Sequence, residues 1–293
     1  MDRIRLELHA HTWYSRGDKI KFDAVDNPED IVLAAKKKGL DGIAIVDHNT
    51  QEGIKRAMKA GDRYNILVIP GMEISSRDGH IVALGIEEKI PRDMSAEETI
   101  ELIHDQGGVA TAAHPFDIES QGVGRLVRKL NFDCIEVFNS INVDKLANRM
   151  AMKVSKDLRI THVAGSDAHT RDMVGLSVNI LDSDLDLDSV IDALRNDKVE
   201  IKTNYASVQQ MVDWSVQRLK LSYPHVSGYI EENYSGPKRI MSKQLLSLVK
   251  MSPGKIDHVF TGLGHISLYA GSFYSGFRYI SALMSNGYEN EGL

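Results

Sequence analysis

Short apolar runs alternate with longer amphipathic stretches over the first 205 residues. The runs are rich in Val and Ile, which favour strands, whereas the stretches between them carry apolar residues at helical spacing. This alternation predicts repeated β-α units and a parallel sheet. The seven predicted strands are Ile4–Leu8, Gly42–Val46, Leu67–Ile69, Ile81–Leu84, Val109–Ala113, Cys134–Phe138 and Thr161–Ala164, a count close to that of a β/α barrel.

Two of the intervening helices have recognisable ends. Asn27 followed by Pro28 predicts an N-cap and a proline at the first helical position, and Gly39 follows three lysines where that helix should stop. Ser95 and Glu98 have the spacing of a capping box. We therefore expect helices to begin after Asn27 and after Ser95.

The alternation of strands and helices stops after residue 205, and aromatic residues become frequent. This tail holds 11 of the 19 aromatic residues of the chain. We predict a barrel domain over residues 1–205 and a mainly helical appendage of unknown role over 206–293. The favoured interpretation is that the appendage packs on the barrel, with a partner-binding surface or a lid as alternatives.

Residues that can bind metals follow five of the seven predicted strands. Because the carboxyl ends of barrel strands lie on one face, such residues would converge although they are distant in sequence. Imidazole and carboxylate are the usual ligands of Zn, Mn and Fe. Alone, each residue would more often be a surface or capping group, and their joint placement favours a metal site. The residues are His9, His11, Asp47, His48, Glu73, His114, Asp167 and His169.

The other histidines and motifs give weaker evidence for a functional site. His80 opens the fourth predicted strand, so metal ligation and a hydrogen-bonding role are both open. A dinucleotide fingerprint, a Walker A sequence and a nucleophile elbow are absent, and Cys134 lies in mid-strand. Metal-activated water is therefore the expected nucleophile. Five histidines lack a strand-end position and are interpreted as structural: His104, His162, His225, His258 and His265.

Composition and charge narrow the class of protein. With 42% hydrophobic and 26% charged residues, the chain resembles an ordinary globular protein. The net charge of −6 has its acidic surplus before residue 206, which argues against a non-specific nucleic-acid binder. The single cysteine excludes an intramolecular disulfide, and neither a targeting peptide nor a membrane span is visible. We expect a cytoplasmic protein that binds no membrane.

The ordered motifs HAHT, VDH, GMEIS, GHIVALG, AHPF and GSDAH resemble those of the PHP family, named for polymerase and histidinol phosphatase. The resemblance covers residues 1 to about 205 and leaves the tail outside. It implies an α/β fold, namely a distorted seven-stranded β/α barrel. The predicted helical appendage would follow this barrel in the chain. It also implies two or three divalent metal ions, Mn, Zn or Fe, and hydrolysis of a phosphate ester.

The resemblance also implies a set of ligands. One ion would be held by His9, His11, Glu73 and Asp167. Glu73 would bridge to a second ion that takes His114, with His80 as a further candidate ligand. A third ion would take His48 and His169, which could otherwise protonate the leaving alcohol. The resemblance also implies one more ligand for this ion, from the loop after the first strand. This chain departs from the family pattern there, because Arg16 and Gly17 stand where a His or Asp is usual. The nearest carboxylate is Asp18, which is the candidate for this ligand.

The resulting hypothesis is a metal-dependent phosphoesterase, a phosphoric ester hydrolase, with Arg16 and Arg171 as phosphate-binding groups. Its substrate would be a small monoester, such as a nucleotide or histidinol phosphate, or the end of a short oligonucleotide, without a stable nucleic-acid partner. Two alternatives are a C–N hydrolase of amidohydrolase type and a non-catalytic structural or regulatory PHP module. The nearly complete ligand set argues against the module.

Overall fold

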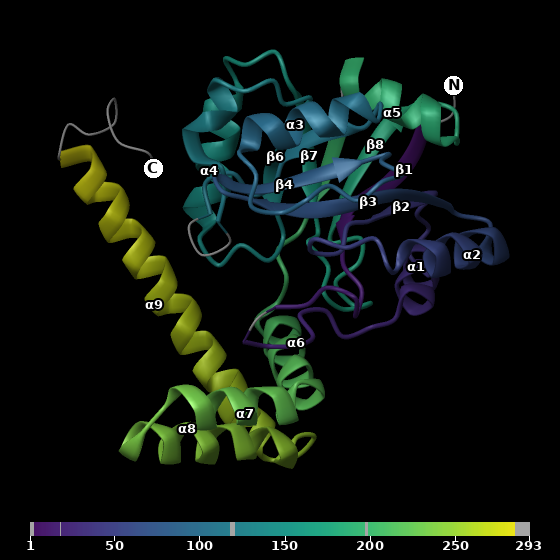
Figure 1. The fold of residues 1–293 in the computed structure, drawn as a ribbon. Helices are drawn as coiled ribbons and strands as arrows, with labels where there is room; N and C mark the ends of the chain where they lie inside the picture. The colour runs from purple at the N-terminus through teal and green to yellow at the C-terminus, as the bar shows by residue number, and fades with distance from the viewer. Residues whose placement is uncertain (1–2, 18, 118–120, 197–198, 285–293) are drawn as a thin grey trace.

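The first part of the chain forms one curled sheet with helices on its outside (Figure 1). The computed structural model describes residues 3–17, 19–117, 121–196 and 199–284. In the order in which they pair, the strands are β7 (Thr161–Gly165), β6 (Cys134–Asn139), β5 (Val109–Ala112), β4 (Gly79–Leu84), β3 (Leu67–Ser76), β2 (Gly42–Ile45), β1 (Arg3–Ala10), β8 (Ser177–Asp182) and β9 (Glu200–Thr203). The helices of this part are α1 (Pro28–Lys37), α2 (Ile54–Tyr64), α3 (Ala96–Asp105), α4 (Lys145–Ser155) and α5 (Leu187–Asn196), with a 3-10 turn at Gly124–Arg128.

The α/β fold is confirmed, but the strand count was wrong, and the sheet is mixed where a parallel one was predicted. All seven predicted strands are present as β1 to β7, and β8 and β9 bring the sheet to nine strands in the described part of the chain. Their short, partly polar sequences gave no strong strand signal. The pairs β1–β2, β2–β3, β5–β6 and β6–β7 are parallel. The pairs β3–β4, β4–β5, β1–β8 and β8–β9 are antiparallel. Gly79 is one reason, because its φ of 139° allows the tight turn that returns β4 alongside β3.

The sheet nearly closes into a barrel where β7 meets β1 and β8. The side-chain amide of Asn179 in β8 accepts a hydrogen bond from Ala164 N at 2.8 Å and donates one to Ala164 O at 2.7 Å. This amide takes the place of a backbone ladder between β7 and β8. A bridge between Ala10, at the carboxyl end of β1, and Ala168, in the segment after β7, adds a backbone contact between these two parts of the barrel.

The predicted helix ends are confirmed. The Asn27 side chain accepts from Asp30 N, and Pro28 begins α1. Ser95 and Glu98 form a reciprocal capping box at α3. Each helix buries one apolar face on the sheet, and the strands enclose a second apolar core inside the barrel. These contacts hold the strand ends in a fixed arrangement.

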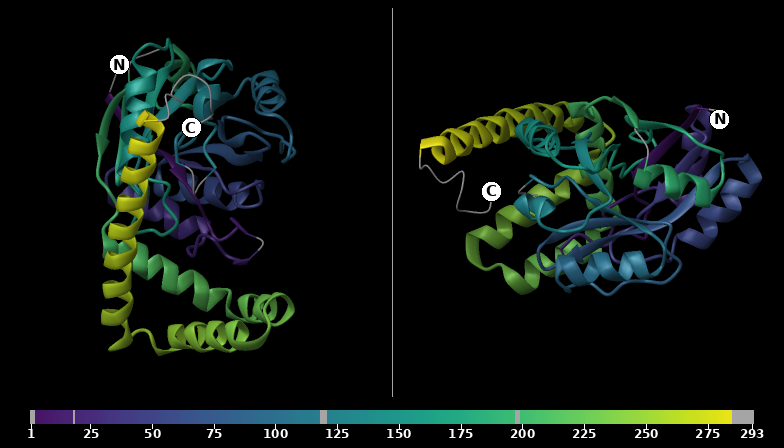
Figure 2. Two further views of the ribbon diagram at one scale, coloured as in Figure 1. Left: turned by 90° about the vertical axis from the view of Figure 1, so that its left-hand side faces the viewer. Right: turned by 90° about the horizontal axis from the view of Figure 1, so that it is seen from above.

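The chain after residue 207 is helical in the part that the structure describes. It comprises α6 (Val208–Leu221), α7 (Tyr223–Asn233), α8 (Gly236–Leu248), a 3-10 turn at Val249–Met251 and α9 (Ile256–Met284). Helices α6 to α8 lie beyond one end of the barrel, and α9 runs back along its side (Figures 1 and 2). A separate small core joins them. The domain boundary at 205 stays a prediction, and none of the described helices could cross a membrane.

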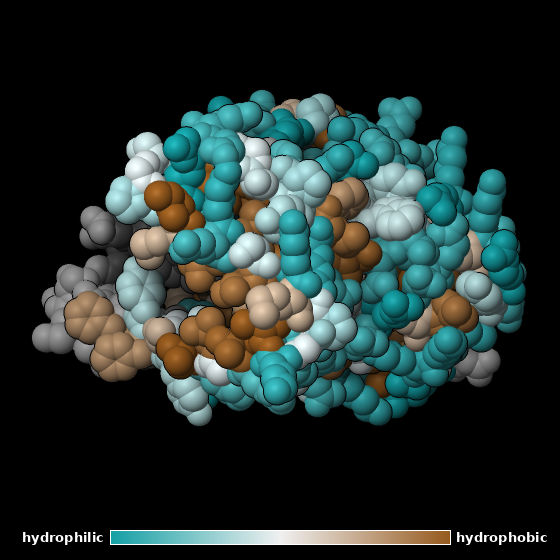
Figure 3. Space-filling view, turned by 90° about the horizontal axis from the view of Figure 1, so that it is seen from below, coloured by the Kyte–Doolittle hydropathy of each residue, from teal (hydrophilic) through white to brown (hydrophobic). Residues whose placement is uncertain are grey.

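Much of the appendage surface is apolar. Seen from below, apolar side chains gather between hydrophilic ones on this end of the molecule (Figure 3). On α8 and α9 the exposed large hydrophobic residues are Ile240, Met241, Leu245, Val259, Leu263, Ile266, Tyr269, Phe273, Tyr274 and Phe277.

Candidate metal centre

Two histidines at the end of β1 begin the cluster. Because alternate strand residues point to the same side, His9 and His11 face one another, with their Nε2 atoms 3.2 Å apart. Asp167 Oδ1, which follows β7, lies 3.6 Å from His9 Nε2 and 3.1 Å from His11 Nε2. All three side chains are buried. The predicted convergence of β1 and β7 is therefore present in the structure.

Glu73 is the centre of the cluster. Its Oε1 lies 2.9 Å from His80 Nδ1 and 3.0 Å from His114 Nε2, and its Oε2 lies 2.9 Å from His48 Nδ1. Glu73 was expected after its strand, yet β3 continues past the predicted end and contains it. Because β4 returns antiparallel to β3, His80 at its start reaches the same end of the sheet. The hairpin thus brings His80 into the cluster.

Several buried atoms of this cluster have no hydrogen-bond partner among the described residues: Glu73 Oε2, His80 Nδ1, His114 Nδ1 and Asp167 Oδ1. The short contacts around Glu73 Oε2 and His80 Nδ1 therefore lack hydrogen-bond geometry. Leaving such a group unpaired costs about 1–3 kcal/mol. Divalent cations fit this donor set, since three triads could each hold one: His9, His11 and Asp167; His48, Glu73 and His80; and His11, His48 and His169.

Charges in the cluster are strongly coupled. Burial opposes ionisation of Glu73, but His48 and His80 outweigh it and hold the Glu73 pKa well below its usual range. Burial, followed by the nearby His169 and His48, lowers the pKa of His11 to about 3. His11 is therefore a neutral imidazole near pH 7, the form that ligates metals.

The third predicted position has an unforeseen carboxylate. Asp18 lies outside the described residues. Asp23, farther along the same loop, places Oδ2 3.4 Å from His48 Nε2 and 3.1 Å from His169 Nε2. Sequence reasoning missed Asp23 because it sits in a long loop far from any strand end. Its carboxylate could complete a metal site with the two histidines.

Glu136 was also missed. Its Oε1 lies 3.0 Å from His9 Nδ1, and its Oε2 accepts a hydrogen bond from His114 N at 2.8 Å. By binding Nδ1, the carboxylate directs His9 Nε2 toward the cluster. Gly165 makes room for this pair, because a Cβ there would lie 1.8 Å from Glu136 Oε1. A lone Glu in the apolar run CIEVF was the available signal.

Two of the cluster residues have unusual backbone angles. His114 has a φ of 29° and Asp167 a φ of 51°, both in a region that L-residues rarely adopt. Each costs on the order of 1–3 kcal/mol and persists only where the surrounding structure enforces it. Such strain is concentrated at functional sites, and here it falls on two predicted metal-binding residues.

A pocket of about 440 Å³ opens beside the cluster, and Asp23, His48 and His80 form part of its wall. Arg16, Lys19 and Arg92 also line it. Arg16 thus lies where the sequence predicted a phosphate-binding group. Arg171 does not line this pocket, and its guanidinium lies 3.3 Å from Asp26 Oδ1.

Comparison with known proteins places this chain in a family. The family model described as PHP-associated matches residues 145–199. An uncharacterised protein of Methanocaldococcus jannaschii is 40% identical over 160 residues, which cover 53% of this chain and 94% of that protein. The phosphoribosyl 1,2-cyclic phosphate 1,2-diphosphodiesterase of Eggerthella lenta is 31% identical over 91 residues, 29% of this chain and 32% of the relative. The chain belongs to the PHP family.

The fold of this PHP protein is also found in a solved structure. PsfC from Pseudomonas syringae PB-5123 superposes with a TM-score of 0.56 at 17% sequence identity, covering 75% of this chain and 100% of PsfC. At this identity the likeness concerns the fold alone.

Proposed function

We propose that this PHP protein is a metal-dependent phosphoesterase that hydrolyses a small phosphate ester with metal-activated water. The observation that carries the proposal is the buried His and carboxylate cluster with its unpartnered atoms, one of which belongs to His80 in the wall of a pocket that Arg16 and Lys19 also line. Cations and a cationic pocket together suit an anionic substrate.

The ligand set follows from the contacts. We assign His9, His11, Glu73 and Asp167 to one ion, and Glu73, His80 and His114 to a second. His48, His169 and Asp23 form the third position. When bound, divalent cations of the Mn, Zn or Fe type supply Lewis acidity, which neutralises phosphate charge and lowers the pKa of a water ligand toward about 7.

The side chains around the pocket define the substrate class. Arg16 and Lys19 would bind and orient the phosphate, whereas Arg92 is paired with Asp93, with its Nε 2.9 Å from Asp93 Oδ2. A neutral amide would gain little from these cations, which favours a phosphoesterase over a C–N hydrolase. A volume of about 440 Å³ is in the range of small-ligand sites. The diphosphodiesterase name of the Eggerthella relative supports including small cyclic and linear diesters with the monoesters.

His48 and His169 have two candidate roles. Both Nε2 atoms face Asp23, so they could hold the third ion. The same nitrogen cannot also protonate the leaving alcohol. In our proposal, His48 and His169 are ligands of the third ion. They would act as proton donors only in protein that carries two ions and leaves the third position empty.

A substrate panel tests the proposal. Metal-stripped protein is reconstituted with Mn²⁺, Zn²⁺ or Fe²⁺ and assayed with nucleoside monophosphates, histidinol phosphate, a cyclic phosphodiester, a short single-stranded oligonucleotide and amide substrates. We expect ester hydrolysis with at least one metal and its loss in a folded His114→Ala variant. Hydrolysis of amides alone, or of nothing on the panel, would refute the phosphoesterase.

A further inference from the structure

Helix α6 of the appendage presents one face to the loops that carry the metal centre. Gln210, Trp214, Arg218 and Ser222 recur every four residues, a spacing that aligns side chains along one side of a helix. The last of them, the C-cap residue of α6, accepts a hydrogen bond from Phe22 N at 3.0 Å through its hydroxyl.

The same face reaches the loop after β7. Gln210 Nε2 donates to the carbonyl oxygen of Asp172 at 3.1 Å. This row of four side chains, the α6 stripe, therefore contacts both loops that bring residues to the third metal position. The first loop carries Asp23, and the second follows His169.

Asp23 is held on two sides by this stripe. Trp214 Nε1 donates to the Asp23 carbonyl oxygen at 2.7 Å, which fixes the backbone. Arg218 Nη1 donates to Asp23 Oδ1 at 2.8 Å. The other carboxylate oxygen, Oδ2, is thereby turned toward His48 and His169.

The two holding side chains also fix one another. The guanidinium carbon of Arg218 lies 4.2 Å from the centre of the Trp214 ring. The Trp214 ring centre is in turn 4.6 Å from that of His169. An Arg stacked on an indole has few alternative rotamers, so its direction toward Asp23 is set before a metal arrives.

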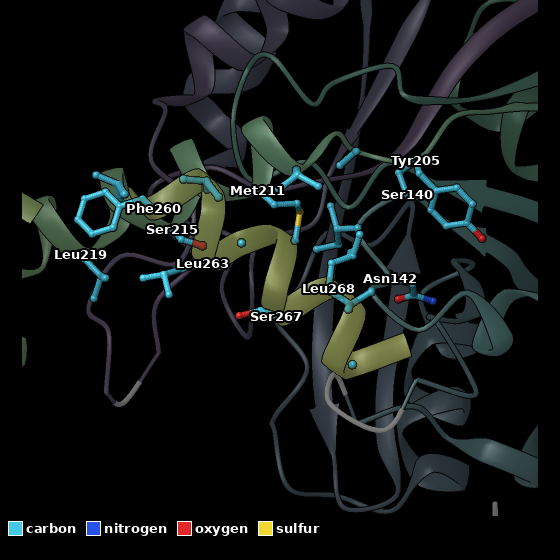
Figure 4. Close-up of a pocket in the computed structure, with 18 of the residues that line it drawn as sticks. Ser140, Asn142, Tyr205, Met211, Ser215, Leu219, Phe260, Leu263, Ser267 and Leu268 are labelled. Carbon is cyan, nitrogen blue, oxygen red and sulfur yellow. The ribbon is translucent and has the colours of Figure 1, made fainter. Parts of the chain in front are cut away.

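The other side of α6 belongs to the appendage. Val212 and Val216 are buried in the small appendage core. Met211, Ser215 and Leu219 face a cavity of about 450 Å³ between α6, α9 and the segment after β6 (Figure 4). Helix α6 therefore links the appendage to the metal centre.

We propose that α6 is a positioning element of the metal centre, in which Arg218 and Trp214 orient Asp23 and so set the affinity of the third ion. This inference rests on the metal-dependent function proposed above. Without the two side chains, the loop carboxylate would sample other directions before binding. Residues that orient metal ligands typically contribute about 10–100-fold to metal affinity.

The test measures metal binding on the full-length chain, without substrate. Mn²⁺ titration calorimetry and metal analysis compare wild type, Asp23→Asn, Arg218→Met and the double variant. We expect Asp23→Asn to lose one equivalent of Mn²⁺, and Arg218→Met to weaken that equivalent by about 10–100-fold. Because Arg218 acts through Asp23, the double variant should bind like Asp23→Asn.

Two controls separate positioning from folding. Arg239→Met removes an appendage arginine that pairs with Glu231, and it should leave Mn²⁺ binding unchanged. Arg218→Lys keeps the charge and should restore part of the affinity. It also carries the test if Arg218→Met does not fold.

Trp214 supplies a second readout. The chain contains two tryptophans, so Trp13→Phe leaves Trp214 as the only one. We expect Zn²⁺ titration to change its fluorescence, and Asp23→Asn to remove that change.

Two results would overturn the inference. In the first, Arg218→Met and Arg218→Lys both bind Mn²⁺ as tightly as wild type does. In the second, the losses of Mn²⁺ affinity in Asp23→Asn and Arg218→Met add together in the double variant. An active phosphoesterase with either result refutes only the role of α6. A protein that shows the expected metal losses yet hydrolyses no ester refutes only the proposed function.

Discussion

The barrel face and the helical appendage treat polar and apolar side chains in opposite ways. The barrel face buries charged groups, with Glu73 1% exposed and Asp167 5% exposed. The appendage exposes apolar groups, with Ile266 65% and Phe273 80% exposed. Buried charges are stable only when paired or bound to metal. In the proposed function, metal ions would pair the buried charges of the barrel, and the appendage would contribute to the site through one face of α6.

The largest expected effect concerns the centre of the barrel cluster. Glu73→Gln keeps the shape but removes the charge that faces His48, His80 and His114. We expect the hydrolysis rate to fall by about 1,000-fold, as when a charge-stabilising group is removed, together with loss of Mn²⁺. Steady-state kinetics and metal analysis measure this. Glu101→Gln, on an exposed position of α3, is the matched control, and full activity of the Glu73→Gln variant would remove the metal assignment.

The next effect compares the two cores by the same substitution. Ile103 on α3 is fully buried in the barrel, and Ile230 on α7 is 5% exposed in the appendage. Ile103→Ala should lower the free energy of unfolding of the barrel by about 2–5 kcal/mol. Ile230→Ala should loosen the appendage and leave the barrel transition in place. Urea unfolding in the Trp13→Phe background, followed by circular dichroism and by Trp214 fluorescence, measures both effects. One shared transition that shifts equally would show that the two regions unfold as a unit.

A buried carboxylate of the barrel gives a pH-dependent effect. Burial raises the pKa of Glu7 from its ordinary 4.5 to about 7, although Ser166, Gly175 and His9 donate hydrogen bonds that oppose the rise. The folded state therefore keeps a proton that the unfolded chain has lost. The Glu7 contribution to stability should thus fall by about 3 kcal/mol as the pH rises from about 4.5 to about 7.

Replacement by Gln tests this sign. Relative to wild type, Glu7→Gln should gain stability between about pH 5 and about pH 8, in urea unfolding of metal-free protein. Glu231→Gln in the appendage removes a half-exposed carboxylate and should show no such trend. A constant difference between wild type and Glu7→Gln across this range would contradict the raised pKa.

The smallest effect on activity and stability is expected for Arg171, which lies outside the pocket. Its side chain is 57% exposed and pairs with Asp26. Arg171→Ala should therefore change the free energy of unfolding by about 1 kcal/mol or less and leave KM unchanged. Arg16→Ala, inside the pocket, should raise KM by about tenfold through loss of a charged hydrogen bond. Kinetics on the two variants compare them directly. An equal or larger KM change in Arg171→Ala would restore the phosphate-binding role that the sequence predicted for it.

The sequence determined seven of the nine strands in the described part of the chain, two helix caps and the candidate ligands at the strand ends, because hydrophobic periodicity and capping are local properties. His9, His11, His114 and Asp167 could be named as candidate ligands from strand ends alone. Tertiary structure decided the rest. His80 joins the cluster through an antiparallel hairpin, Glu136 orients His9 across the sheet, and Asp23 reaches the centre because Trp214 and Arg218 of a distant helix hold its loop. Those contacts join segments far apart in the chain, and their geometry is set by packing, which no local pattern encodes.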